Sequence, residues 1–375
     1  MRAYLDYNAT VPPFPEVWER LAGLQRLPLG NPSSLHQEGR EARALLEQAR
    51  GQVAALVGAA CEEVVFTSGG TEANAMALWG LALDLGGPAG VTVYVCAVEH
   101  PSVFAAAENL ARLGARVEVL PVDQQGRLQL EGLAVRTPAV VCLQLANHET
   151  GVLQPVEALV ARVPQAQVRV HCDAVQAVGK IPVNFFRLGV DTLALSGHKL
   201  GGLPGAGALV VRRGLELPAL VPGEQEHRRR GGTEPLVAAC AMGWACALLS
   251  ARAQEWQRVA KLRDQLEEEL LAKGLAEEVF SRLAPRVPNT SCFALPAPLS
   301  GQVAVAALDL AQIAVSSGPA CSSGASRESA VVRAMGFGEK AGRTLRVSLG
   351  LATTPEEVAY FGSALERLIR RGESA

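Results

Sequence analysis

A glycine-rich turn at residues 68–71 (Ser-Gly-Gly-Thr) has the composition of an anion-binding site. It follows an apolar run and precedes a helical pattern, so free backbone N–H groups and the positive end of a helix dipole would meet there. A phosphate group is the natural ligand of such a turn, although a simple strand-to-helix turn accounts for the segment equally well. The spacing matches neither G-x-x-x-x-G-K-[ST] nor G-x-G-x-x-G, which disfavours ATP and dinucleotides.

A second polar cluster, residues 196–199 (Ser-Gly-His-Lys), ends another apolar run and contains Lys199, one of only five lysines in the chain. A free cation at the end of a core strand is costly to bury, so the amine either becomes neutral or is covalently occupied. A Schiff-base lysine meets both conditions. The alternative is a lysine whose stem follows the loop out to solvent.

A third candidate is Asp173, which comes directly after the apolar run 168–172. A carboxylate in this position needs a cationic or hydrogen-bonding partner. A protonated pyridine nitrogen would be one such partner, and capping of the next helix is the alternative. All three clusters follow predicted strands, and the carboxyl ends of parallel strands are where α/β sheets bind ligands. A phosphate-binding turn, a Schiff-base lysine and an aspartate together predict a pyridoxal 5'-phosphate site.

The elements that would position these clusters are apolar runs alternating with helical patterns. Continuous apolar runs indicate strands covered by helices on both faces, and helical crossovers between them indicate a mostly parallel sheet. We therefore predict an α/β fold, with a seven-stranded sheet in a large domain at residues 13–250 and a smaller α+β domain at residues 1–12 and 251–375. One long helix from Pro235 towards Leu271 would bridge the domains. The predicted strands are 63–67, 91–96, 116–120, 139–144, 168–172, 191–195 and 207–211, with 291–294, 313–316 and 344–348 in the smaller domain.

The composition is that of a globular enzyme. Of the 375 residues 49% are hydrophobic and 19% charged, which excludes a disordered or fibrous chain. A net charge of −2 gives no electrostatic footprint for nucleic acid or an acidic membrane. The uncharged run 235–251 is predicted to be a buried helix, and without a signal peptide a cytoplasmic protein is expected. The eight cysteines form no C-x-x-C pair, so we expect no metal site and no disulfide framework.

Nine motifs in one order make the sequence similar to the cysteine desulfurases of the class V aminotransferase family. The resemblance covers nearly the whole chain and implies fold-type I enzymes that use pyridoxal 5'-phosphate. The small residues around Cys321 resemble the long-loop branch linked to iron–sulfur cluster assembly. The motifs are residues 4–10, 30–34, 68–72, 99–100, 147–151, 196–199, 231–234, 316–322 and 346–350.

The resemblance also implies a role for each matching residue. Lys199 would carry the cofactor and move the substrate α-proton, Asp173 would bind the pyridine nitrogen, and Gln176 would bind the phenolic oxygen of the ring. His100 would stack on the ring, and His148 stands where the family usually has an asparagine that contacts the cofactor. Arg346 would bind the substrate carboxylate, with Asn147 beside it. The phosphate would be held by Gly70, Thr71, Ser196 and His198, with Thr233 from a second subunit.

Cys321 decides the reaction that the resemblance implies. It lies among small residues between Gly318 and Gly324, a composition typical of an exposed loop. There its thiolate would take the sulfur of L-cysteine as a persulfide and release L-alanine, and His100 is our hypothesis for the proton carrier. An incidental loop cysteine is the alternative. The expected partners are L-cysteine, a second copy of the chain and a sulfur-acceptor protein such as an iron–sulfur scaffold, with neither nucleic acid nor membrane.

The sequence departs from the family pattern at three places: His148, residues 202–205 (Gly-Leu-Pro-Gly), which lack a usual lysine, and the charged segment 223–233. Three other functions stay open. A selenocysteine lyase or aminotransferase would keep Lys199, Asp173 and Arg346 without needing Cys321. A non-catalytic sulfur-relay protein would not need Lys199. A phosphate-dependent enzyme without pyridoxal phosphate would use only the glycine-rich turn.

Overall fold

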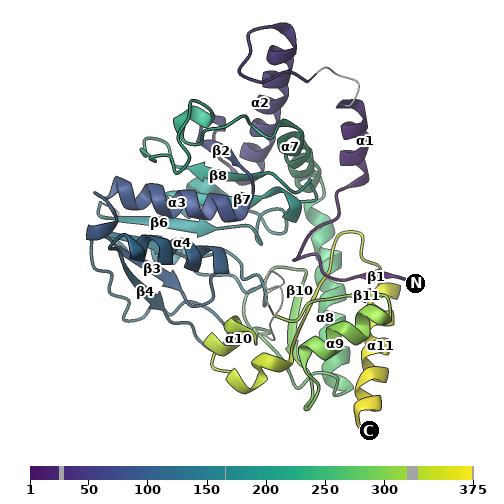
Figure 1. The fold of residues 1–375 in the computed structure, drawn as a ribbon. Coiled ribbons are helices and arrows are strands. Elements are labelled where there is room, and N and C mark those ends of the chain that lie inside the picture. Colours follow the sequence, from purple (N-terminus) through teal and green to yellow (C-terminus); the bar gives the residue numbers. More distant parts are fainter. Residues whose placement is uncertain (25–28, 165, 319–327, 374–375) are drawn as a thin grey trace.

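The seven predicted strands of the larger domain form one sheet in the computed structural model, which describes residues 1–24, 29–164, 166–318 and 328–373 (Figure 1). Its strand order is β2-β8-β7-β6-β5-β3-β4; β8 runs antiparallel to β2 and β7, and the other pairings are parallel. The predicted α/β class with a mostly parallel sheet is therefore confirmed. The strands are β2 (Val64–Thr67), β3 (Thr92–Cys96), β4 (Arg116–Leu120), β5 (Ala139–Cys142), β6 (Val168–Asp173), β7 (Thr192–Ser196) and β8 (Gly207–Val211).

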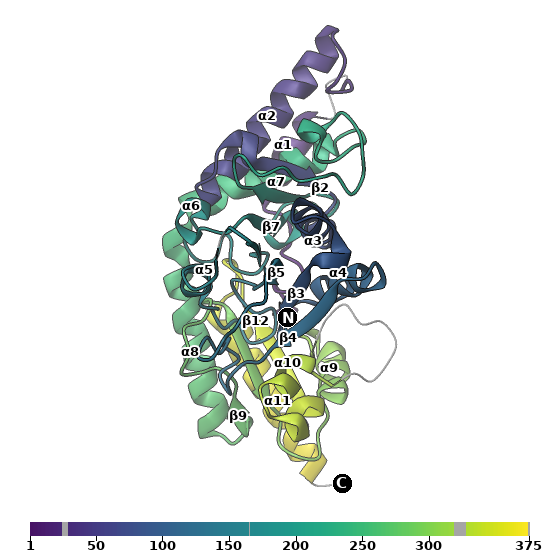
Figure 2. The same cartoon turned by 90° about the vertical axis from the view of Figure 1, so that its left-hand side faces the viewer.

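Helices cover both faces of this sheet, which is why its central strands are buried almost throughout. On one face α3 (Gly70–Asp84) and α4 (Pro101–Arg112) enclose a separate apolar core with side chains of β2, β3, β5, β7 and β8. On the other face α7 (Leu236–Ala251) packs against α2 (Gln37–Val57), and both stand at one end of the molecule in Figure 2. The two helix backbones come so close that a Cβ at Gly243 would lie 2.6 Å from the Cα of Ala49. Shorter helices complete this part: α1 (Pro15–Leu24), α5 (Val156–Val160) and α6 (Phe185–Leu188).

The single long helix predicted from Pro235 to Leu271 is wrong, because α7 ends at Ala251 and α8 (Trp256–Ala272) leaves it at 64°. The backbone departs from helical geometry at Arg252 (φ −104°, ψ 13°). Two contacts hold the corner: Arg252 pairs with Glu16, and the Trp256 indole donates to the Gly179 carbonyl at 2.5 Å. Neither glycine nor proline marks the break, so the local sequence does not reveal it.

The second unit contains an antiparallel sheet of order β12-β10-β9 and a small parallel pair, β1 with β11. The pair joins segments that lie far apart in the sequence. These pairings support our proposal that residues 1–12 and 251–375 form one domain. The elements are β1 (Ala3–Tyr4), β9 (Glu278–Val279), β10 (Thr290–Ala294), α9 (Gly301–Leu310), β11 (Ile313–Ala314), α10 (Ala330–Ala334), β12 (Thr344–Ser348) and α11 (Pro355–Glu373).

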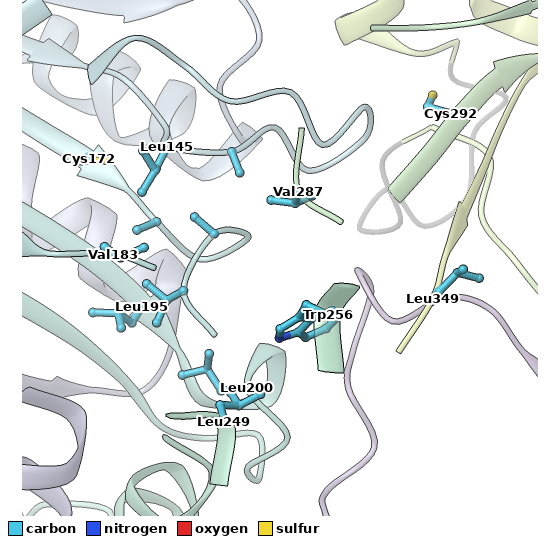
Figure 3. Close-up of a cluster of buried hydrophobic side chains, with 14 of the residues drawn as sticks. Leu145, Cys172, Val183, Leu195, Leu200, Leu249, Trp256, Val287, Cys292 and Leu349 are labelled. Atoms are coloured by element: carbon cyan, nitrogen blue, oxygen red, sulfur yellow. The ribbon is translucent and has the colours of Figure 1, made fainter. Parts of the chain in front are cut away.

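The two units share an apolar core around Trp256. Figure 3 shows its indole beside Leu200 and Leu249, and all three line one cavity of about 250 Å³. In the part of the chain that the structure describes, no helix alone has the length and apolar character needed to cross a membrane. The bent pair α7 and α8 passes that test only jointly, by length and composition.

Candidate active site

A cavity of about 140 Å³ opens at the carboxyl ends of β6 and β7, next to the first turn of α3. It brings together side chains that come from distant parts of the sequence. The predicted site residues that line it are Gly70, Thr71, His100, His148, Asp173, Gln176, Ser196, His198, Lys199 and Arg346. Thr233 and Asn147 do not line it, and Cys321 lies outside the described residues.

Lys199 follows β7 in a single 3₁₀ turn, and the N-terminal segment of the chain covers it. Its Nζ donates to the backbone carbonyls of Asn8 at 2.6 Å and Ala9 at 2.5 Å. The neighbouring His198 makes a 2.9 Å contact through Nδ1 with the hydroxyl of Thr10. Burial, and secondarily the Lys199 cation, lower the pKa of His198 to about 4. Near neutral pH His198 is therefore an uncharged hydrogen-bonding group.

Asp173 is the last residue of β6, and both of its carboxylate oxygens are held. Oδ1 accepts from the Val175 backbone N–H at 3.0 Å, and Oδ2 accepts from the Asn74 amide at 2.8 Å. Since a carboxylate only accepts, Asn74 must turn its Oδ1 towards His171, at 2.9 Å from Nε2. That arrangement assigns the His171 proton to Nε2. Burial lowers the pKa of His171 to about 4, so its imidazole is neutral near neutral pH. It orients Asn74, which in turn donates to Asp173.

His100 caps the N-terminus of α4, which fixes the orientation of its ring. Its Nδ1 accepts the Ser102 backbone N–H at 3.2 Å and lies 2.8 Å from the Ser102 hydroxyl. Nδ1 is thus an acceptor and the proton resides on Nε2. The centroids of the His148 and His100 rings lie 5.3 Å apart in an edge-to-face arrangement. Burial lowers the pKa of His148 well below its usual value. The Nδ1 of His148 is buried without a partner among the described residues.

Arg346 projects from β12 and is almost fully buried. One terminal nitrogen pairs with Asp6 at 2.7 Å, and the other donates to the His148 carbonyl at 3.0 Å. Asp6 also accepts from the Ser316 hydroxyl at 2.8 Å. Within the described ranges the Nε of Arg346 has no partner, so this guanidinium is fixed in place and retains a donor.

The donor set of this cavity fits pyridoxal 5'-phosphate. The first turn of α3 provides backbone N–H groups for the phosphate, and a Cβ at Gly70 would come within 2.9 Å of the Val175 side chain. Asp173 is a fixed carboxylate for a pyridinium nitrogen, and Lys199 is an amine for the aldehyde. The unpartnered Nδ1 of His148 adds a polar atom that a bound group could satisfy.

Comparison with known proteins gives the family. A model described as Aminotransferase class-V matches residues 3–361. The chain belongs to the class-V aminotransferase family. Within it, the chain is 37% identical over 374 residues to "Cysteine desulfurase IscS" of Dictyoglomus turgidum (strain DSM 6724 / Z-1310), covering 98% of this chain and 94% of that relative.

Solved structures of the same family have the same fold. A NifS-like protein superposes with a TM-score of 0.91 at 31% identity, covering 99% of this chain and all of that one (100%). A second structure, described as "SspA in complex with cysteine", gives a TM-score of 0.80 at 27% identity, covering 94% and 100%. The resemblance to cysteine desulfurases that the motifs indicate is therefore confirmed.

Two residues assigned from the class-V aminotransferase resemblance are placed outside the cavity. The side chain of Asn147 closes its own turn, because Oδ1 accepts from the backbone of Glu149 and Thr150 and Nδ2 donates to the Val98 carbonyl. We therefore assign Asn147 to the support of the loop that carries His148 instead of to substrate. Thr233 is exposed and does not line the cavity of its own chain, so its role across a dimer stays a prediction.

Sequence reasoning missed several polar residues that the class-V fold brings to this site. Asn74 lies one helical turn after Gly70, which was a usable signal because Gly70 begins the anion-binding turn. Lys180 lies four residues after Gln176 and bonds to it, a spacing that is also local. Asn8 belongs to a quoted motif, but its contacts with Thr290 and Ser348 are long-range and carry no local signal. The other polar side chains of the cavity wall that sequence reasoning missed are Ser102 and Gln144.

Proposed function

We propose that this protein is a pyridoxal-phosphate-dependent cysteine desulfurase that converts L-cysteine to L-alanine and leaves a persulfide on Cys321. The observation that carries the proposal is the convergence of Lys199, Asp173 and Arg346 on one cavity. The desulfurase relatives and the neighbour solved with cysteine support the choice of substrate. The part of Cys321 rests on its motif.

The cofactor would be held by groups from three elements. The N–H groups at Gly70 and Thr71 would bind its phosphate together with Ser196 and His198. Asp173, steadied by Asn74, would bind the ring nitrogen. Bound there, pyridoxal phosphate would supply a conjugated ring that takes up electron density from the substrate α-carbon.

Lys199 is the residue that would move the substrate proton. The Asn8 and Ala9 carbonyls accept from its Nζ and keep the amine at the cavity wall. After moving a proton, the amine would need only a small displacement to return to these two carbonyls. His100 has its Nδ1 occupied by Ser102, so any proton it carries travels through Nε2. That geometry is compatible with the hypothesis that His100 serves Cys321.

Arg346 would select the substrate by its carboxylate. Its guanidinium is anchored on Asp6 and the His148 carbonyl and retains N–H donors for a second anion. Since Asp6 also holds Ser316, the substrate-binding arginine is tied to the segment that leads towards Cys321.

The sulfur step conserves atoms and electrons. The Cys321 thiolate attacks the substrate sulfur, an S–S bond forms as the Cβ–S bond breaks, and the released carbon receives a proton to give alanine. The persulfide would then pass to an acceptor protein such as an iron–sulfur scaffold, and a homodimer would complete the phosphate site with Thr233.

Alanine and sulfide release from L-cysteine with a thiol reductant tests the proposal. We expect activity in the wild-type holoenzyme, none in Lys199→Ala, and loss to background in Cys321→Ser. Cys61→Ser is the matched control, because Cys61 is exposed and distant from the cavity lining. After incubation with L-cysteine alone, peptide mass spectrometry should find one added sulfur atom on Cys321. Full activity in Cys321→Ser would favour a selenocysteine lyase or aminotransferase, and a colourless protein would exclude a pyridoxal-phosphate enzyme.

A further inference from the structure

Lys180 is a lysine buried behind the cavity, and no ion pair in the described ranges includes it. It is 6% exposed, and its Nζ donates to two neutral oxygens, Asn8 Oδ1 at 2.8 Å and Gln176 Oε1 at 2.7 Å. Burial, reinforced by Lys199 and Arg346, lowers the pKa of Lys180 well below its usual value. Burying a lysine amine costs free energy, and its only hydrogen bonds among the described residues are to the amide oxygens of Asn8 and Gln176. Such a residue needs a functional explanation.

The contacts of Gln176 show what this lysine controls. Its Nε2 donates to the Asn8 backbone carbonyl at 3.0 Å, and its Oε1 accepts from Lys180. A carbonyl oxygen only accepts, so the two partners together fix which end of the carboxamide faces which way. An amide nitrogen has a second N–H, and Gln176 lines the cavity, so the fixed orientation presents a donor to whatever binds there.

The same carbonyl links Gln176 to Lys199. Asn8 O accepts from both Gln176 Nε2 and Lys199 Nζ, at 3.0 and 2.6 Å. Asn8 is itself anchored through its side chain, because Oδ1 also accepts from Asn289 and Nδ2 donates to Thr290. Lys180 therefore acts on Gln176 directly. Through the anchored side chain of Asn8 it also acts on the residue whose carbonyl accepts from Lys199.

We propose that Lys180 is a positioning residue that locks Gln176 as a hydrogen-bond donor towards the cofactor and holds the Asn8 carbonyl against Lys199. The inference rests on the proposed function, in which Gln176 contacts the phenolic oxygen of pyridoxal phosphate. A fixed donor at that oxygen stabilises its anionic form. This stabilisation favours loss of the proton on the nitrogen that Lys199 contributes at lower pH.

Replacement of Lys180 by methionine should remove this effect. Gln176 Oε1 would be buried without a donor, which favours rotation of the amide and loss of the N–H facing the cavity. The other titratable or charged groups facing Lys199 stay in place in the variant, so they do not confound the comparison. They are Tyr7, His100, His148, Asp173, His198 and Arg346.

The test is a pH titration of the visible absorbance of the holoenzyme. We expect the midpoint in Lys180→Met to rise by about one pH unit, a tenfold change in the proton dissociation constant. Lys180→Arg should retain the wild-type midpoint, because Arg keeps N–H donors and the cavity of about 250 Å³ that Lys180 also lines has room for a guanidinium. Lys261→Met is the matched control, since it removes an exposed lysine.

A double-mutant cycle separates positioning from a general structural effect. If Lys180 acts through Gln176, the shift caused by Lys180→Met should be largely lost when Gln176→Leu is already present. An unchanged midpoint in Lys180→Met, or a shift that persists in full in the Gln176→Leu background, overturns the inference. Should Lys180→Met fail to retain the cofactor, Lys180→Gln is measured instead, and an unchanged midpoint there overturns it equally. A wild-type protein that stays colourless with pyridoxal phosphate overturns the proposed function, and the inference falls with it.

Discussion

The neutral imidazole of His171 makes a specific contribution to acid sensitivity. The residue is fully buried on β6, with Nδ1 against the Thr192 hydroxyl and Nε2 against Asn74, each at 2.9 Å. The folded protein therefore resists its protonation, and burial lowers the pKa from 6.5 to about 4, with Asp173 opposing only in part. We take His171→Gln as the perturbation, because glutamine keeps hydrogen-bonding atoms but does not titrate.

The sign and size of this change in the free energy of unfolding follow from the linkage between proton binding and folding. Below a pH of about 6.5 the unfolded chain binds a proton that the folded chain refuses, so the stability that His171 contributes is present above this pH and lost as the pH falls towards about 4. The lowered pKa corresponds to a loss of about 3 kcal/mol in the free energy of unfolding once the pH has fallen below both pKa values, and ~2 kcal/mol of this is lost between about pH 7.5 and pH 5.

Urea unfolding of wild type and His171→Gln at both pH values measures this effect. The other titrating groups, including His198, are present in both proteins and cancel in the difference. We expect the stability advantage of the wild type to shrink by ~2 kcal/mol on acidification. An advantage that is equal at the two pH values would show that the buried ring is not held neutral.

Three further outcomes are expected from contacts elsewhere in the fold. Arg50→Met should lower the free energy of unfolding by about 3–5 kcal/mol in urea titrations, because it leaves the buried Glu226 carboxylate without its bidentate partner, and adding Glu226→Gln should recover part of the loss. Iodoacetamide should alkylate the exposed Cys61 at least ~100-fold faster than Cys240, whose burial raises its pKa to about 11; peptide mass spectrometry of timed samples measures both rates. Arg346→Lys should raise KM for L-cysteine ~10-fold or more in steady-state assays, with a smaller change in kcat, since the lysine cannot keep Asp6 and the substrate carboxylate bound together.

Much of the large sheet could be predicted because its signals are local. Most of its strands are short, largely apolar runs between turn-forming residues, and Asp173 and Ser196 end their strands where the cavity opens. The break at Arg252 could not be predicted, because the contacts that turn the chain come from Glu16 and Gly179, far away in the sequence.

The site itself divides in the same way. Residues inside contiguous motifs, such as Lys199 and Gln176, were found from the sequence and its resemblance to a family. The residues that orient them were not, because a hydrogen bond between Asn8 and Thr290 leaves no pattern in either segment. Asn147 shows the opposite case: its position in a motif suggests contact with substrate, whereas its Oδ1 closes the turn that carries His148.

The position of the N-terminal segment has a consequence for biosynthesis. β1 pairs with β11, and the Asn8 backbone N–H donates to Ser348, 340 positions further along the sequence, so residues 3–8 leave the ribosome long before their partners are translated. The carbonyls of Asn8 and Ala9 can reach their final place over Lys199 only once that distal stretch has emerged. Under the proposed function, capture of the vitamin-derived cofactor in its finished environment would be deferred until β12 has been translated, and nascent chains stalled before β12 would expose an unfinished lysine pocket.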